Sequence, residues 1–302
     1  MCGIVGLFIK NPDHRPELGR HLTTMMDGMS ERGPDSAGVA IYRDSVSEGQ
    51  SKLTLFHPDP GYPWQEIMRR LAADLGIGAE VTVTANHALL VMDAGDGPPR
   101  EWLAASAPGV RVMGYGRTME VYKDMGAPRE VVARYDIAAM QGTHGLGHTR
   151  MATESIVTTE HSHPFTAAPD ICLVHNGSLS NHHALRRWLR HRGQHFDTDN
   201  DTEVAACYIA FRLGEGATLE EAGDACLKDF DGFFTLTMGT RDGFAVLRDA
   251  IACKPAVLAE TDDWVAMASE YRSLAHLPGV ADAAIWEPEP AVMYTWSLQG
   301  EK

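Results

Sequence analysis

The chain has 302 residues, of which 44% are hydrophobic and 22% charged, a composition typical of a globular protein with a substantial core. Its 41 acidic and 26 basic residues give a formal net charge of −15, which argues against nucleic acid or an anionic membrane as a partner. The five cysteines form no CxxC pair, no apolar run approaches the ~20 residues of a membrane span, and no signal peptide is recognisable, so a cytoplasmic protein is expected.

The predicted elements begin with a buried strand over residues 3–9, a helix over 16–29 and a second buried strand over 36–42. Residues 44–140 differ, because Pro and Gly clusters separate short elements there. The elements expected in this region are a helix over 64–75, strands near 81–84 and 88–92, and a helix over 128–140. We therefore predict one domain over residues 1–302, with a small α/β insertion at about 44–140.

The second half of the chain alternates between strands and helices without strict βαβ order. Its predicted strands cover residues 144–149, 171–175, 233–239, 244–248, 256–260 and 264–268. Its predicted helices cover residues 181–192 and 201–213, and a third begins at Thr218, where Glu221 completes a capping box. This mixture favours layers of the α+β class over a doubly wound parallel sheet.

Cys2 directly follows Met1, so removal of Met1 would leave one residue that holds both a nucleophile and a base. A free α-amine has a pKa near ~7.7–8.0 and can accept a proton at neutral pH. Such an amine can activate the thiol beside it without a separate histidine.

Three later segments offer groups that complement a nucleophile at Cys2. Arg150 can clamp a carboxylate through two parallel hydrogen bonds. Asn176 and Gly177, expected in a tight turn at the end of a strand, offer a side-chain amide and a backbone N–H to a developing oxyanion. Asp201, at a predicted helix N-terminus, can hold an ammonium group. Singly, each has a plainer interpretation: a surface ion pair, a type I′ turn and a helix cap.

Five segments resemble, in order and in kind, the signature of class II glutamine amidotransferases, the N-terminal-nucleophile glutaminase domains. They are residues 2–6, 32–38, 147–153, 175–177 and 201–203. The resemblance covers about residues 1–42 and 141–275, and it implies a four-layer αββα sandwich of the N-terminal nucleophile hydrolase type.

The same resemblance implies roles for individual residues. Cys2 would be the nucleophile, and Asn176 with Gly177 would form the oxyanion hole. Arg150 would bind the α-carboxylate of L-glutamine and Asp201 its α-amino group. Two further substrate-binding residues are expected, Arg32 and Thr153.

Members of this family that act alone carry a synthase domain after the glutaminase, so the ammonia acceptor is expected on a partner synthase subunit. Residues 114–123 resemble the free-standing amidotransferase subunit of glutamate-synthase-like enzymes, including the N-methylglutamate synthase type. The resemblance implies no cofactor in this chain, with FMN and an iron–sulfur cluster on the partner.

Two other functions are compatible with the sequence. One is a different N-terminal-nucleophile amidohydrolase, although Arg150 and Asp201 together select a free α-amino acid. The other is a non-catalytic scaffold subunit of a synthase complex, which retention of Met1 would favour. No metal site is expected, because the histidine pairs at 161/163 and 182/183 have no third ligand at conventional spacing. Three cysteines on apolar faces are predicted to be buried core thiols: Cys172, Cys207 and Cys226.

Overall fold

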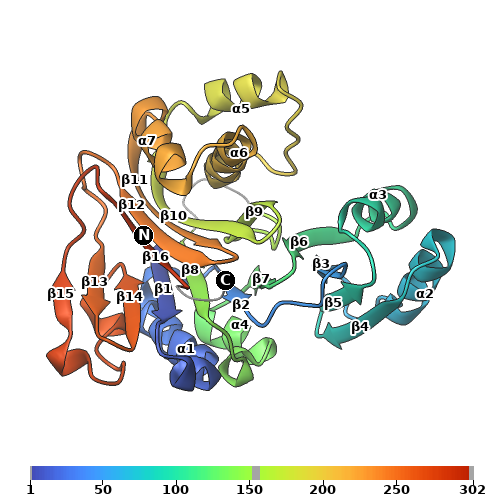
Figure 1. The fold of residues 1–302 in the computed structure, drawn as a ribbon, viewed down its shortest axis with the longest axis horizontal. Coiled ribbons are helices and arrows are strands. Elements are labelled where there is room, and N and C mark those ends of the chain that lie inside the picture. The colour runs from blue at the N-terminus through green and yellow to red at the C-terminus, as the bar shows by residue number, and fades with distance from the viewer. Residues whose placement is uncertain (1, 152–156, 299–302) are drawn as a thin grey trace.

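The computed structural model describes residues 2–151 and 157–298, and in it two stacked β-sheets are covered by helices on both outer faces (Figure 1). The seven-stranded sheet has the order β15-β13-β14-β1-β8-β2-β7. In that order its strands are Ala284–Trp286, Val257–Glu260, Trp264–Ala268, Gly3–Ile9, His144–Arg150, Ser36–Tyr42 and Met119–Met125. The five-stranded sheet has the order β16-β12-β11-β10-β9. Its strands are Met293–Ser297, Gly243–Arg248, Gly232–Thr240, Ile171–Leu179 and Phe165–Ala168.

The alternation of side chains along the strands explains the layers. In β1, Ile4 and Phe8 are buried in the core between the two sheets, together with Val174 of β10. The intervening Val5 and Leu7 are buried on the opposite face, against the helices. A strand with apolar residues at every position can therefore bury both of its faces.

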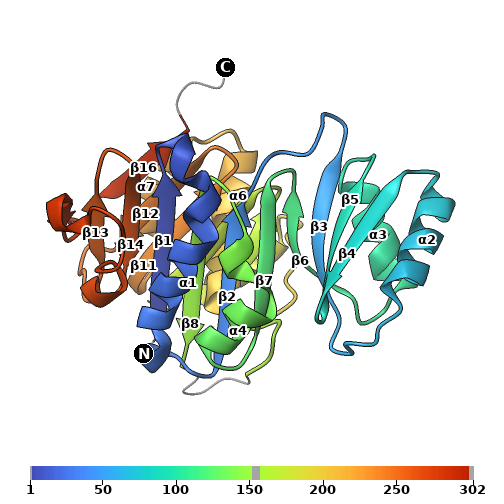
Figure 2. The same ribbon diagram turned by 90° about the horizontal axis from the view of Figure 1, so that it is seen from below.

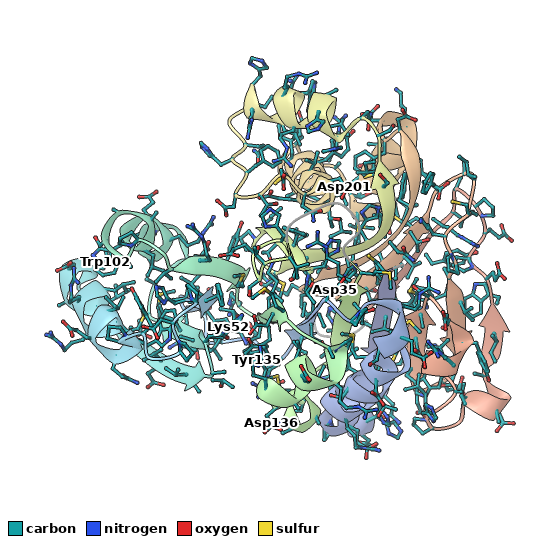
Figure 3. All side chains as sticks on the ribbon, turned by 180° about the vertical axis from the view of Figure 1, so that it is seen from behind. Asp35, Lys52, Trp102, Tyr135, Asp136 and Asp201 are labelled. Carbon is teal, nitrogen blue, oxygen red and sulfur yellow. The ribbon has the colours of Figure 1, made fainter. Side chains whose placement is uncertain are left out.

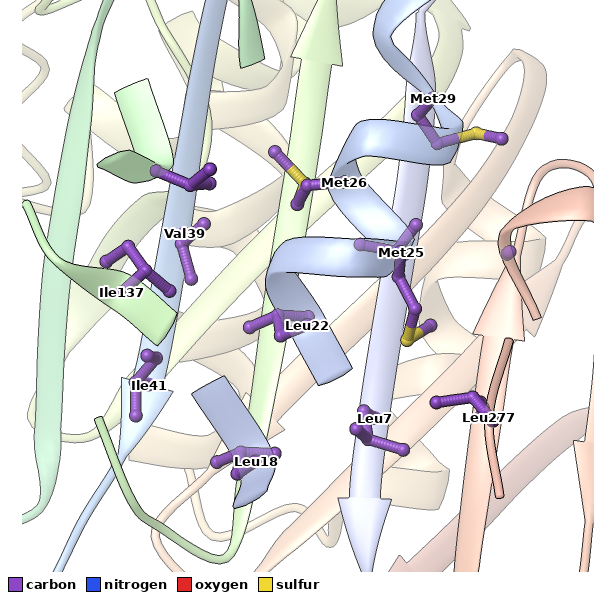
Figure 4. Packing of buried hydrophobic residues seen from close by; sticks show 14 of the residues in the cluster. Leu7, Leu18, Leu22, Met25, Met26, Met29, Val39, Ile41, Ile137 and Leu277 are labelled. Atoms are coloured by element: carbon purple, nitrogen blue, oxygen red, sulfur yellow. The ribbon is translucent and has the colours of Figure 1, made fainter. Parts of the chain in front are cut away.

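The helices cover the two outer faces. The first, α1 (Leu18–Gly28), buries Leu18, Leu22, Met25 and Met26 against the seven-stranded sheet, at the i, i+4, i+7 and i+8 spacing of one helix face (Figure 4). The short α4 (Pro128–Arg134) lies beside it. The helices over the five-stranded sheet are α5 (His182–Arg190), α6 (Asp201–Gly214) and α7 (Leu219–Asp229). The predicted four-layer α+β arrangement and the capping box that begins α7 are confirmed.

A third, four-stranded sheet lies beside β7 (Figure 2). Its order is β4-β5-β3-β6, with strands Ala79–Thr84, His87–Met92, Ser51–Phe56 and Arg111–Gly116. Helices α2 (Trp64–Leu75) and α3 (Gly97–Ser106) share with it a hydrophobic core of its own. Within the predicted insertion at 44–140, only residues up to Gly116 belong to this sheet. Strand β7 instead pairs with β2 along its whole length, so it and α4 belong to the seven-stranded layer.

A buried polar junction joins this sheet to β7 of the seven-stranded sheet. Lys52 of β3 places Nζ 3.1 Å from Oε1 of Glu120 on β7, and both side chains are almost fully buried. Asn86, between β4 and β5, accepts from the hydroxyl of Tyr135 at 2.7 Å and donates from Nδ2 to Asp124 of β7 at 3.0 Å. Lys52 and Tyr135 both lie at this junction (Figure 3). These contacts hold the four-stranded sheet and β7 together.

One predicted helix is shorter than expected. The helix predicted over 128–140 ends at Arg134, because Asp136 adopts a left-handed conformation with φ of 49° that α-helix cannot continue. A separate 3-10 turn, Ile137–Ala139, follows it.

Over the described part of the chain, none of the helices combines the length and the apolar character that crossing a membrane requires.

Candidate active site

Cys2 directly precedes β1, at the end of the seven-stranded sheet where Arg150 ends β8. Gly3 pairs with Thr149 of β8, so Cys2 comes beside Arg150, the next residue of β8. The alternation along β1 puts Cys2 on the same face as Ile4 and Gly6, toward the five-stranded sheet. Its thiol is free and partly exposed.

Arg32 holds the backbone of Cys2 in place. Its Nε donates to the Cys2 carbonyl at 3.2 Å, and its Nη1 lies 2.5 Å from Oε1 of Glu270. The pKa of Glu270 is lowered by this hydrogen bond and by its second pairing, with Arg272. Arg32, predicted to bind substrate, is thus placed directly against the predicted nucleophile.

Arg150 ends β8 and is buried. Its Nη1 donates to the carbonyl of His161 at 3.4 Å. A Cβ on Gly33 would lie 2.5 Å from the Arg150 nitrogen, so only glycine allows the turn at residues 32–35 to approach β8 this closely. The turn before β2, part of the motif at residues 32–38, therefore packs against Arg150, the predicted carboxylate clamp.

Asn176 and Gly177 lie inside a strand, and the tight turn predicted for them is wrong. Strand β10 continues to Leu179 because β11 pairs with it throughout, Asn176 opposite Thr235 and Gly177 opposite Phe234. Glycine is needed at 177 for a steric reason, since a Cβ there would lie 2.1 Å from the carbonyl oxygen of Phe233. The Asn-Gly pair serves close strand packing and not chain reversal.

The amide nitrogen of Asn176 is a buried donor that has no acceptor among the described residues. The residue is 3% exposed, and Nδ2 finds no hydrogen-bond partner in the described parts of the chain. Because even-numbered residues of β10 face the other sheet, this donor faces the same interface as Cys2. Leaving such a donor unpaired costs about 1–3 kcal/mol, so it is available to hydrogen-bond a ligand oxygen placed beside Cys2.

Asp201 is the first residue of α6, and it connects that helix to β10. Its Oδ2 accepts from the backbone N–H of Leu179 at 3.0 Å, and its Oδ1 lies 3.8 Å from Nδ1 of His175 (Figure 3). The preceding Asn200 caps the helix and also donates to the carbonyl of His161 at 3.4 Å. Arg150 and the start of α6 therefore share one acceptor, so the structure brings the predicted carboxylate and ammonium clamps together. Thr153 lies outside the described residues.

The histidines around this interface are weak bases. His148 and His163 stack with ring centroids 3.9 Å apart. Burial lowers the pKa of His148 to about 3 and that of His163 well below its usual value. Burial also lowers the pKa of His175. These imidazoles are neutral at pH 7 and hold protons poorly, so they are unsuited to accept the proton of a thiol.

Sequence reasoning missed Lys123, a lysine of β7 that is buried beside the site. Its Nζ donates to three backbone carbonyls, and it was given no role because it falls in the predicted insertion. The available signal was a lysine within a strand whose neighbours are largely apolar. Burial lowers the pKa of Lys123 to about 8, so the ammonium form predominates at pH 7.

The three cysteines predicted as core thiols are buried, and the described residues hold no cluster of possible metal ligands. Cys172, Cys207 and Cys226 are buried, as predicted, and burial raises the pKa of Cys172 to about 12. Nowhere in residues 2–151 and 157–298 do three or more His, Cys, Asp or Glu side chains gather in a way that could hold a metal ion.

Two sequence relatives match this chain over almost its whole length, and a third matches part of it. The family described as glutamine amidotransferase domain matches residues 136–293. A glutamine amidotransferase-like protein, GlxB, of Rhizobium meliloti is 52% identical over 99% of both chains. A putative glutamine amidotransferase of Methanothermobacter thermautotrophicus is 33% identical over 97% of this chain and 99% of its own. A glutamine–fructose-6-phosphate aminotransferase of Mycobacterium bovis is 39% identical over 47% of this chain and 23% of its own.

Among solved structures, the glutamine phosphoribosylpyrophosphate amidotransferase of B. subtilis, complexed with ADP and GMP, has a TM-score of 0.63. The match covers 99% of this chain and 48% of that enzyme at 19% sequence identity. At this identity the likeness shows a shared N-terminal-nucleophile fold alone. The family match and the two relatives that cover almost the whole chain establish that it belongs to the glutamine amidotransferase family, and its fold agrees with that of class II members.

Proposed function

We propose that this chain hydrolyses L-glutamine to glutamate and ammonia, with Cys2 as the nucleophile. The observation that carries the proposal is the unpaired Nδ2 of Asn176, which is buried at the interface that Cys2 faces. A tetrahedral intermediate formed on a side-chain amide places a negative charge on one oxygen, and such a donor would stabilise it.

The chemistry requires that Cys2 be the first residue. Its α-amine takes the thiol proton, and Sγ attacks the side-chain carbonyl carbon of glutamine. The oxyanion receives hydrogen bonds from Asn176 Nδ2 and the Gly177 N–H. The protonated amine then gives its proton to the departing nitrogen, ammonia leaves, and water hydrolyses the glutamyl thioester. The weak basicity of the buried histidines supports the α-amine as the base.

Arg150 and Asp201 would select a free α-amino acid. A guanidinium at Arg150 and a carboxylate at Asp201 are complementary to the α-carboxylate and α-ammonium of glutamine. Arg150 and Asn200, the residue before Asp201, both donate to the His161 carbonyl. A peptide-bound glutamine has neither terminal charge and would leave both groups uncompensated.

The acceptor of the ammonia would lie on a partner synthase subunit of a glutamate-synthase-like complex, of the N-methylglutamate synthase type. In support, two relatives match this chain over 99% of their own length, whereas the aminotransferase relative matches over 23%. Relatives of this length thus exist without the long additional region of the aminotransferase. Any FMN or iron–sulfur cluster would belong to the partner.

Intact-mass measurement and a glutamate-release assay test the proposal. The native protein should begin at Cys2 and release glutamate from glutamine, while Cys2→Ala and Cys2→Ser should fold and release none or very little. Full activity with Met1 retained would exclude the mechanism. A retained Met1 without activity would favour the scaffold role instead.

A further inference from the structure

We infer that Lys123 is a positioning residue for glutamine binding: it holds residues 160–164 so that the His161 carbonyl meets Arg150 and Asn200. This inference rests on the proposed function, since it concerns the same substrate site. Lys123 itself is separated from the predicted substrate groups by the segment that it holds.

The ammonium group of Lys123 donates hydrogen bonds to the backbone of this segment. Its Nζ donates to the carbonyl of Ser162 at 2.7 Å, of Pro164 at 3.1 Å and of Glu160 at 3.3 Å. An ammonium group has three N–H donors, so these three carbonyls can satisfy all of them. The side chain is 3% exposed and also lies over the Phe165 ring, 4.6 Å from its centroid.

The direction of the carbonyls divides the segment between two sets of partners. The carbonyls of residues 160, 162 and 164 point to Lys123, whereas the intervening carbonyl of His161 accepts from Arg150 and Asn200, each at 3.4 Å. Residues 159–163 form a turn and bend in which the Ser162 N–H donates to the Thr159 carbonyl at 3.2 Å. Holding the carbonyls of residues 160 and 162 restricts the two peptide groups that flank the His161 carbonyl, and so keeps that carbonyl directed toward the predicted substrate clamps.

The surrounding structure leaves room for this arrangement. A Cβ on Gly38 of β2 would lie 2.1 Å from the His163 carbonyl oxygen, so the segment lies directly on the sheet next to Lys123. Asp124, the next residue of β7, accepts from the hydroxyl of Thr159 at 2.7 Å. Strand β7 thus anchors the segment at successive residues.

The test compares two buried lysines that differ in their partners. Lys123→Met removes the ammonium group at nearly constant volume. Lys52→Met is the matched control, because Lys52 is equally buried but pairs with Glu120 at the junction with the four-stranded sheet. Glutamate release gives KM and kcat at pH 7, and amide hydrogen exchange reports on residues 158–163. Thermal unfolding establishes that each variant is folded.

Lys123→Met should raise KM for glutamine about tenfold and change kcat less than about twofold, because a misplaced clamp weakens ground-state and transition-state binding alike. Exchange in residues 158–163 should become faster in this variant and stay unchanged in Lys52→Met. A wild-type KM in folded Lys123→Met would overturn the inference, and so would equal increases in the two variants.

Two further controls keep the test decisive. If Lys123→Met does not fold, Lys123→Gln retains an amide that can donate two hydrogen bonds, and it should raise KM about threefold. An unchanged KM in that folded variant would also refute the role. If the wild-type protein releases no glutamate, the proposed function fails by itself, and the exchange rates still decide whether Lys123 holds the segment.

Discussion

Replacing Asn176 with Ala should separate catalysis from stability. Removing one oxyanion donor typically lowers kcat by about 10²–10³, or about 2.7–4 kcal/mol of transition-state stabilisation. In the ligand-free protein the Nδ2 is buried without a partner in the described chain, a condition that costs about 1–3 kcal/mol. Truncation relieves this cost while it removes packing atoms, so the free energy of unfolding should change by less than about 1 kcal/mol.

The control is Asn11→Ala. Asn11 lies just beyond the end of β1 that is farther from Cys2. The amide of Asn11 is fully used: Nδ2 donates to Asp263 at 2.8 Å and Oδ1 accepts from the Asp13 N–H at 3.1 Å. This variant should lose about 1–2 kcal/mol of stability and keep its kcat. Urea unfolding and glutamate release measure the two quantities. A wild-type kcat in Asn176→Ala, or a loss of activity that merely follows a loss of stability, would refute the reasoning.

Three more predictions follow from the same structure. Arg150→Ala should raise KM at least about tenfold with little change in kcat, because a carboxylate clamp binds ground and transition states alike; a selective fall in kcat would contradict its role. Burial lowers the pKa of His87, His144 and His148 to about 3, so the folded state binds fewer protons than the unfolded state, and stability present above pH 6.5 is lost as pH falls toward 3. Urea titrations should show a loss of about 4 kcal/mol between pH 7.5 and 5.5, about 1.4 kcal/mol for each histidine, and a flat profile would contradict the buried neutral state. Finally, a purified synthase partner should raise kcat at saturating glutamine, and an unchanged kcat would argue against partner-dependent activity.

Local sequence pattern predicted most of the layered core, because its strands are apolar throughout and its helices have apolar residues at helical spacing. The apolar stretches at residues 3–9 and 36–42 became the fully buried β1 and β2, and the helical spacing from Leu18 to Met26 became the face of α1. Cys2, Arg150 and Asp201 lie at the start or end of a recognisable element, as predicted, and their roles stay predictions. Short-range periodicity carries this information without tertiary contacts.

The errors arose where a distant partner decided the conformation. Asn176-Gly177 is a turn dipeptide by local preference, yet β11, more than fifty residues later in the chain, keeps it in a strand. Strand β7 contains Glu120, Lys123 and Asp124, which are poor strand formers, but pairing with β2 and buried polar contacts compensate for their charge. Neither partner is visible in a local window of sequence.

Lys123 shows why the hydrogen-bond partners of a buried residue can lack any sequence signature. Its partners are backbone carbonyls, which every residue of a chain possesses, so no side-chain pattern at residues 160–164 marks them as ligands of an ammonium group. The dependence is also mutual. An unpaired ammonium could not be buried at this position, and three converging carbonyls could not be left without a donor. The conformation of the segment and the burial of the lysine therefore form together, and β7, the strand next to the four-stranded sheet, takes part in shaping the predicted substrate clamp.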